Sequence, residues 1–291
     1  MKSPPFAYVA PETIEGVVTG LVEAGEDAKV IAGGQSLLPV LALRLGRPSV
    51  LVDVGRVPGL DAIEMTDRGL RLGAGVTHAT LERHPVVAEH APLLAEVAPH
   101  IGHAAIRTRG TLGGSLAHAD PAAELPAAVV LAGGSITARG PRGTRSVDAA
   151  EFFDGYLTTV LATDEVLESV HLPRRAPAVG DAFAEVSRRH GDFALVGAGA
   201  RVRLDEGGRV AEARLVFLGA GSTPVLDLES GAAAIGRAPV ADVFVEVGRE
   251  AGARLEPHDD LHASASYRRR VAGALAARVL ATAAARAGGS T

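Results

Sequence analysis

Two glycine-rich segments, far apart in the sequence, constrain this chain more than any other feature. The first is Ala32-Gly33-Gly34-Gln35-Ser36, and the second is Thr111-Leu112-Gly113-Gly114-Ser115. Because glycine has no Cβ and reaches positive φ freely, its backbone N–H can approach a phosphate closely. Two such turns that face each other can hold the two phosphates of one dinucleotide, with the hydroxyls of Ser36, Thr111 and Ser115 as further donors. The sequence therefore predicts a pyrophosphate site built from two turns.

The better-known phosphate and nucleophile motifs do not occur. No lysine follows either glycine pair, as a P-loop requires, and no Gly-x-Ser-x-Gly segment indicates a hydrolase. Two Gly-Ala-Gly runs, at 197–199 and 219–221, are followed by Val202 and Pro224 where a Rossmann fingerprint has its third glycine. We expect these two runs to be strand and turn glycines.

Two sets of side chains have spacings that occur in metal sites, namely His100 with His103, and His118 with Asp120 and Glu124. The first pair has no third ligand nearby, and neither set has a water-activating signature, so we expect no metal site. Asp120 and Glu124 are instead candidates to accept hydrogen bonds from ribose or adenine groups. Asp120 is also predicted to cap a helix that begins near Pro121, and a helix start can lie beside a bound nucleotide.

Composition excludes several functions. The chain has 291 residues and no cysteine, which excludes disulfides, thiolate nucleophiles and iron–sulfur clusters held by its own side chains. A net charge of -5 gives no general attraction to nucleic acid or anionic membranes. No charge-free apolar run reaches about 18 residues, and the N-terminus lacks the apolar stretch of a secretion signal. We therefore expect a cytoplasmic protein with no transmembrane segment and no nucleic-acid partner.

Hydrophobic periodicity predicts an α/β unit through about residue 57, followed by a mixed segment. The first unit is expected to contain a helix over 11–24 ended by Gly25, a strand over 28–32, a helix over 37–45 and a strand over 49–54. The mixed segment is expected to contain a hairpin over 63–72, helices over 77–84 and 86–97, an apolar stretch over 121–131, and strands over 135–138, 144–147 and 166–172.

A proline-rich, cationic segment at 173–180 is the predicted domain boundary. Beyond it the pattern predicts an antiparallel sheet with helices, from strands over 182–188, 194–204 and 211–218 and helices over 226–235, 240–251 and 267–286. Arg268-Arg269-Arg270 are expected to open the last helix on a polar face, with a docking patch as the alternative. The fold class is therefore α+β.

Five segments together resemble the molybdenum hydroxylase flavoproteins, which include the medium subunit of aerobic carbon monoxide dehydrogenase and the FAD domain of xanthine dehydrogenase. The segments occur in the family's order over almost the whole chain, at 32–39 (AGGQSLLP), 106–115 (IRTRGTLGGS), 120–126 (DPAAELP), 187–194 (SRRHGDFA) and 264–269 (SASYRR). Each segment is common by itself, but the combination is specific.

The resemblance implies a two-subdomain FAD-binding domain of the PCMH type at 1–175, with subdomains at about 1–57 and 58–175. It also implies a smaller C-terminal α+β domain with an antiparallel sheet at 176–288. By the same resemblance, residues 32–36 and 111–115 bind the FAD pyrophosphate, Asp120 and Glu124 contact FAD, and Leu167 lies near the flavin ring. Relatives often have a lysine where this chain has Ala184-Glu185, and the carbon monoxide enzymes have a tyrosine beside the flavin where this chain has Phe193. Phe193 can stack on the flavin but has no hydroxyl.

The resemblance implies an electron-transfer role. In the family, a large subunit oxidises substrate at molybdenum, a small subunit carries two [2Fe–2S] clusters, and FAD on the medium subunit passes electrons to NAD, a quinone or oxygen. This chain is expected to be that FAD subunit, in a dimer of heterotrimers, with no catalytic acid or base of its own. Two alternatives stay open, a stand-alone FAD-dependent oxidoreductase and a non-catalytic nucleotide-binding or assembly module.

Overall fold

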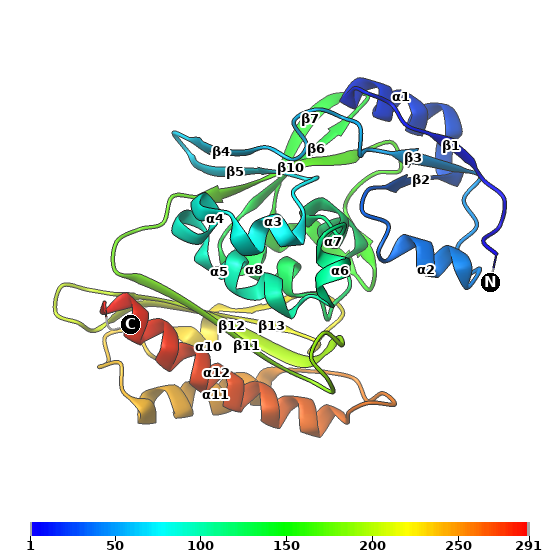
Figure 1. The fold of residues 1–291 in the computed structure, drawn as a ribbon. Coiled ribbons are helices and arrows are strands. Elements are labelled where there is room, and N and C mark those ends of the chain that lie inside the picture. Colours follow the sequence, from blue (N-terminus) through cyan, green and yellow to red (C-terminus); the bar gives the residue numbers. More distant parts are fainter. Residues whose placement is uncertain (1, 290–291) are drawn as a thin grey trace.

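The computed structural model describes residues 2–289 and confirms the α+β class. Figure 1 shows the main body as layers: an antiparallel sheet, the helices α3 to α8, a second antiparallel sheet, and a last layer that contains the helices α11 and α12. A smaller unit with its own parallel sheet lies at one end of the first sheet, beside the N-terminus.

The small N-terminal unit positions the first glycine segment. Its sheet has the order β1-β3-β2, and its elements are β1 (Ala7–Val9), α1 (Ile14–Ala24), β2 (Ala28–Ile31), α2 (Leu37–Ala42) and β3 (Val50–Asp53). Thr13 caps the start of α1, and Gly25, with φ of 64°, ends it as predicted. Strand β1 was not predicted, because three exposed residues carry no usable hydrophobic pattern.

The middle of the chain forms the first antiparallel sheet and the helical layer beneath it. The sheet has the order β4-β5-β10-β6-β7, with β4 (Ile63–Thr66), β5 (Gly69–Gly73), β6 (Ser135–Gly140), β7 (Gly143–Asp148) and β10 (Val166–Pro173). The helices are α3 (His78–Arg83), α4 (Pro85–His90), α5 (Pro92–Val97), α6 (Ala104–Arg107), α7 (Leu112–His118), α8 (Glu124–Leu131) and α9 (Ala149–Phe152). A two-stranded piece, β8 (Phe153–Gly155) with β9 (Thr158–Thr159), completes this part.

The C-terminal part has a sheet of order β11-β12-β13-β14 covered on its outer side by α11 and α12. Its elements are β11 (Val179–Ser187), β12 (Ala194–Leu204), β13 (Val210–Leu218), β14 (Val225–Asp227), α10 (Leu228–Ala232), α11 (Ala241–Arg254) and α12 (Ala265–Ala287). The inner side of this sheet packs on α8, and all eight residues of α8 are buried. One hydrophobic core therefore runs from β5 and β10 through α8 to Phe183, Val216 and Leu218 of the second sheet.

Several sequence predictions differ from the structure for identifiable reasons. The single helix predicted over 86–97 is two helices, because Pro92 begins a new one after Ala91. The predicted helix over 226–235 begins as strand β14 and becomes helical only at Leu228. The polar face predicted for Arg268 is wrong, because the Arg268 side chain of α12 is buried, whereas those of Arg269 and Arg270 are exposed.

Candidate functional site

The first glycine segment connects β2 to α2 and presents a row of free backbone donors. Gly34 has a φ of 71°, a conformation that favours glycine. Within residues 2–289, no protein group accepts a hydrogen bond from the backbone N–H groups of Gly33, Gly34, Gln35 or Ser36. The Gln35 amide donates to the Gly33 carbonyl at 2.9 Å and so braces the loop. Consecutive unpaired N–H groups form a concave anion site, which fits a phosphate.

The second glycine segment is not the turn that the sequence predicts, because its glycines lie in the first turn of α7. Thr111 is the N-cap, and its hydroxyl oxygen accepts from Gly114 N–H at 3.0 Å. The N–H of Gly113 donates to Ala74 at 2.8 Å, and a Cβ on Gly113 would lie 2.6 Å from the Ala74 Cβ. Gly113 is therefore required where α7 meets the end of β5, not for phosphate approach.

The donors that this segment offers a ligand are fewer than predicted. The N–H groups of residues 112–115 all have backbone or hydroxyl partners within the protein. Thr111 pairs with Thr77 in a narrow antiparallel bridge, in which the N–H of Thr111 points away from Thr77. That N–H, the Thr111 hydroxyl hydrogen and the Ser115 hydroxyl are the groups left to donate.

The two glycine segments meet through their backbones. A Cβ on Gly33 would overlap the carbonyl oxygen of Arg109 and lie 2.9 Å from the Cα of Gly110. Only glycine at position 33 allows this approach. The structure thus brings the loop at 32–36 against the start of the segment at 109–115, as a shared pyrophosphate site requires.

A buried histidine holds the second segment in place. His78 begins α3, and its Nε2 lies 3.0 Å from the carbonyl oxygen of Thr111. A Cβ on Gly110 would lie 2.8 Å from the His78 ring, so this packing requires glycine at position 110. Burial lowers the pKa of His78 to about 4, and at neutral pH the uncharged ring donates its Nε2 hydrogen to Thr111.

The acidic segment follows α7 directly, but Asp120 does not cap a helix at Pro121 as predicted. Helix α8 begins at Glu124, and Asp120 Oδ1 instead accepts from the N–H of Ala122 at 2.9 Å in a local turn. Asp120 is half-buried, and Glu124 is buried at 6% exposure. Burial, followed by the negative charge of Glu185, raises the pKa of Glu124 to about 8.

The sequence analysis missed a cluster formed by Glu185, Glu124 and His100. It treated Glu185 only as the loss of a lysine. The Glu185 side chain on β11 is 5% exposed, and its Oε1 lies 3.4 Å from Nδ1 of His100. The hydrogen bond to Glu185 raises the pKa of His100. Glu185 Oε2 is buried without a hydrogen-bond partner in the part of the chain that the structure describes. The signal that could have revealed Glu185 is a carboxylate within a largely apolar strand.

The two residues predicted beside the flavin ring have opposite surroundings. Phe193 lies on the 188–193 loop between β11 and β12 and is 70% exposed. Gly191 of that loop packs against the His103 ring, where a Cβ would lie 2.9 Å away. Leu167 on β10 is 5% exposed inside the main core, so little of its side chain faces a ligand. Their contacts with a flavin stay predictions.

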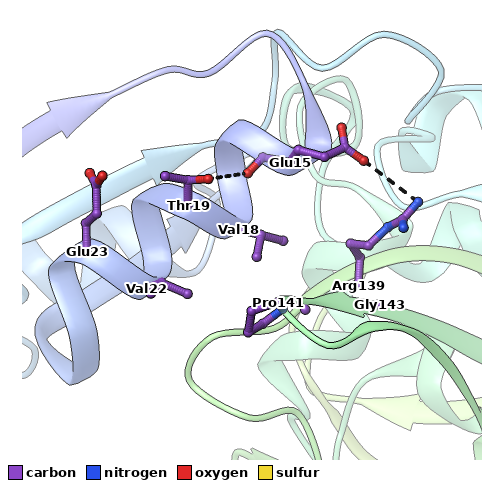
Figure 2. A pocket seen from close by; sticks show the side chains of 9 residues that line it. Glu15, Val18, Thr19, Val22, Glu23, Arg139, Pro141 and Gly143 are labelled. Atoms are coloured by element: carbon purple, nitrogen blue, oxygen red, sulfur yellow. Dashed lines mark hydrogen bonds and ion pairs between the residues drawn. The ribbon is translucent and has the colours of Figure 1, made fainter.

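Other features of the described residues do not compete with this site. Among residues 2–289, no three His, Cys, Asp or Glu side chains are placed to hold a metal ion, and no helix is long and apolar enough to cross a membrane. A pocket of about 530 Å³ opens between α1 and the β6–β7 hairpin. Figure 2 shows its charged rim, where Glu15 faces Arg139, and its apolar floor at Val18 and Val22. Neither glycine segment lines it.

Comparison with known proteins identifies the family. Residues 4–175 match the family model "FAD binding domain in molybdopterin dehydrogenase", and residues 181–283 match "CO dehydrogenase flavoprotein C-terminal domain". The chain therefore belongs to the FAD-binding medium subunits of molybdenum hydroxylase complexes, which are subunits of oxidoreductases, and FAD is its cofactor.

Several relatives match along nearly their full length. The chain is 40% identical to the 6-hydroxypseudooxynicotine dehydrogenase complex subunit alpha of Paenarthrobacter nicotinovorans, over 97% of this chain and 96% of the relative. It is 33% identical to the carbon monoxide dehydrogenase medium chain of Hydrogenophaga pseudoflava, over 96% and 97%. Among solved structures, quinoline 2-oxidoreductase from Pseudomonas putida 86 matches with a TM-score of 0.94 at 39% identity, covering 99% of both chains.

Proposed function

We propose that this chain is the FAD subunit of a molybdenum hydroxylase complex. Its bound FAD is proposed to connect the partner subunits to an external electron acceptor. The observation that carries the proposal is the row of unpaired N–H groups at 33–36 beside the Thr111 segment. These groups suit a pyrophosphate, and the match to the FAD-binding family model supports FAD as the dinucleotide. The hydroxyls of Ser36, Thr111 and Ser115 supplement the backbone donors.

The chain's own residues are proposed to bind and orient the cofactor. When bound, FAD would supply the redox chemistry that connects one-electron [2Fe–2S] donors on a partner to an acceptor such as NAD, a quinone or oxygen. The loop at 32–36 and the start of α7 at 111–115 hold the pyrophosphate, Asp120 and Glu124 lie at the adjoining segment, and Phe193 covers the flavin. The absence of cysteine supports clusters on a separate small subunit.

The partners are proposed to be an iron–sulfur small subunit and a molybdenum-containing large subunit, in a dimer of heterotrimers. Relatives named as complex subunits or medium chains support this assembly. The complex is of the carbon monoxide dehydrogenase or xanthine dehydrogenase type. Several relatives act, by name, on nitrogen heterocycles such as nicotine, caffeine and quinoline, so these compounds come first in a substrate panel, with carbon monoxide next.

Affinity purification of the tagged chain from its native host tests the assembly. We expect flavin, iron, molybdenum and two further chains to co-purify. Flavin without metals or partners, together with substrate turnover, identifies a stand-alone flavoenzyme and contradicts the proposal. A chain that binds nucleotide without flavin reduction, or binds nothing, is an assembly module.

A substitution tests the placement of the pyrophosphate. Gly34→Asp puts a side chain and a negative charge into the loop at a φ of 71°, and we expect it to abolish FAD binding. Gly236→Asp is the matched control, because Gly236 has a φ of 78° and open space around its Cβ position on the C-terminal part. Normal FAD binding by the Gly34→Asp chain contradicts the placement.

A further inference from the structure

Arg268 is a buried cation in a position that the site does not explain. It lies in the first turn of α12 and is 7% exposed, whereas Arg269 and Arg270 beside it are exposed. Burying a guanidinium is unfavourable unless its hydrogens have partners. The partners of Arg268 therefore indicate what this charge does.

The guanidinium links three separate segments. Its Nη1 donates to the carbonyl oxygens of Leu195 and Gly219, the latter at 3.1 Å, and its Nη2 donates to Asp260 Oδ2 at 2.5 Å. Gly219 has a φ of 67°, and a Cβ there would lie 2.7 Å from the Leu195 oxygen. The start of β12, the end of β13 and the loop before α12 thus converge on one side chain.

Two of these contacts lead to the segments that are proposed to contact FAD. Leu195 comes two residues after Phe193, so Arg268 fixes the C-terminal end of the 188–193 loop. The peptide of Gly219 is held from both sides, because its carbonyl accepts from Arg268 and its N–H donates to the Pro121 carbonyl at 2.8 Å. Pro121 belongs to the acidic segment at 120–124.

The third contact leads to the other end of the same loop. Asp260 Oδ1 accepts from the N–H groups of His262 and Ala263, each at 2.8 Å, which makes the 259–263 turn compact. Nδ1 of His262 then lies 3.4 Å from Nη1 of Arg188, the first residue of the 188–193 loop. Both ends of the loop are therefore connected to Arg268, one directly and one through Asp260.

We propose that Arg268 is a positioning residue for FAD, holding the 188–193 loop and the 120–124 segment in a fixed relation without contacting the cofactor. This inference rests on the proposed function, because those two segments are the ones assigned to FAD. A guanidinium is required, since its two Nη groups donate in different directions at once. A lysine ammonium cannot reproduce that geometry.

The test compares Arg268→Lys with Arg269→Lys in the full-length chain. Arg269→Lys makes the same chemical change one residue along the same helix at an exposed position. We expect Arg268→Lys to weaken FAD binding about tenfold, as loss of a charge-assisted hydrogen bond does, and to change the visible circular dichroism of bound FAD. Amide hydrogen exchange over 188–195 should become faster. Arg269→Lys should match wild type in all three measurements.

A second variant decides the matter if Arg268→Lys does not fold. Asp260 is 46% exposed, so Asp260→Asn removes the charge from the outer partner while it keeps the Oδ1 acceptor. We expect it to bind FAD about threefold more weakly, with the same change in the dichroism spectrum.

The outcomes separate this inference from the proposed function. Wild-type FAD affinity and dichroism in the folded Arg268→Lys chain, or in Asp260→Asn if only that chain folds, with lower thermal stability, assign Arg268 to folding alone and overturn the inference. A wild-type chain that binds no FAD contradicts the proposed function itself.

Discussion

Gly33 and Arg109, on separate segments, lie so close that the Arg109 carbonyl oxygen fills the space of a Cβ at position 33. This contact joins the N-terminal parallel sheet to the helical layer at the place where the free N–H groups of the first loop are found. The geometry of the candidate pyrophosphate site therefore depends on one missing methyl group.

Gly33→Ala is expected to separate the 32–36 loop from the segment at 109–115, because the Arg109 backbone carbonyl cannot move aside as a flexible side chain can. We expect a loss of stability of about 1–3 kcal/mol and at least a tenfold loss of FAD affinity, measured by urea unfolding and by titration with FAD. Gly155→Ala is the control, since its Cβ would meet nothing within 4 Å. Unchanged FAD affinity in the folded Gly33→Ala chain would show that the loop contact does not form the site.

Thr111→Val is expected to weaken both α7 and the cofactor site, because the hydroxyl caps the helix and is also a proposed phosphate donor. The matched variant is Thr13→Val, which removes the N-cap of α1, where Thr13 accepts from Gly16 N–H at 3.1 Å. Each should lose about 1 kcal/mol of stability in urea unfolding.

Only Thr111→Val should also reduce FAD affinity, and Thr111→Ser should restore it. Equal FAD binding by the Thr111 and Thr13 variants would reduce Thr111 to a structural cap.

The sequence predicted the elements whose hydrophobic period is clear, and missed contacts between residues distant in the chain. The strand over 194–204 matches β12 because its residues are apolar or glycine from Ala194 to Ala200 and then alternate with arginine. That the two glycine segments face each other was predicted from the chemistry of a pyrophosphate, but the contact of Gly33 with the Arg109 carbonyl was not. The pairing of His100 with Glu185 was not predicted, because nothing local in either segment indicates the other. Arg268 was misassigned for the same reason, since two of its three acceptors are backbone carbonyls, which a sequence does not display.

A mostly buried ion pair on the second antiparallel sheet also contacts the helical layer. Arg201 on β12 donates from Nε to Asp181 Oδ1 at 2.6 Å and from Nη1 to the carbonyl of Ala132, beyond the end of α8, at 3.1 Å. Asp181 is 2% exposed, so Arg201→Met leaves a buried carboxylate whose one remaining cationic partner among residues 2–289 is Arg175, at 3.7 Å.

We expect Arg201→Met to destabilise the chain by about 3 kcal/mol in urea unfolding, since removing one partner of a buried pair is costly. Arg203→Met, on the same strand with a 39% exposed side chain, should lose less than about 1 kcal/mol. Adding Asp181→Asn to Arg201→Met should recover part of the loss. Equal effects of the Arg201 and Arg203 variants would contradict this account of the contact.

The buried Glu124 should make the stability of the FAD-free chain fall as pH rises. Its pKa is raised to about 8 in the folded chain, whereas an exposed glutamate has 4.5. Between these values the folded state keeps a proton that the unfolded state releases, so the free energy of unfolding decreases with pH and this contribution is fully lost above about pH 8. Glu124→Gln cannot ionise and should remove that part of the pH dependence, becoming the more stable protein above pH 8.

Urea unfolding of wild type and Glu124→Gln from pH 5 to 9 measures the difference in stability. Glu206→Gln, on the exposed β12–β13 turn, is the control. Parallel pH profiles for wild type and Glu124→Gln would show that the folded chain does not hold the Glu124 proton.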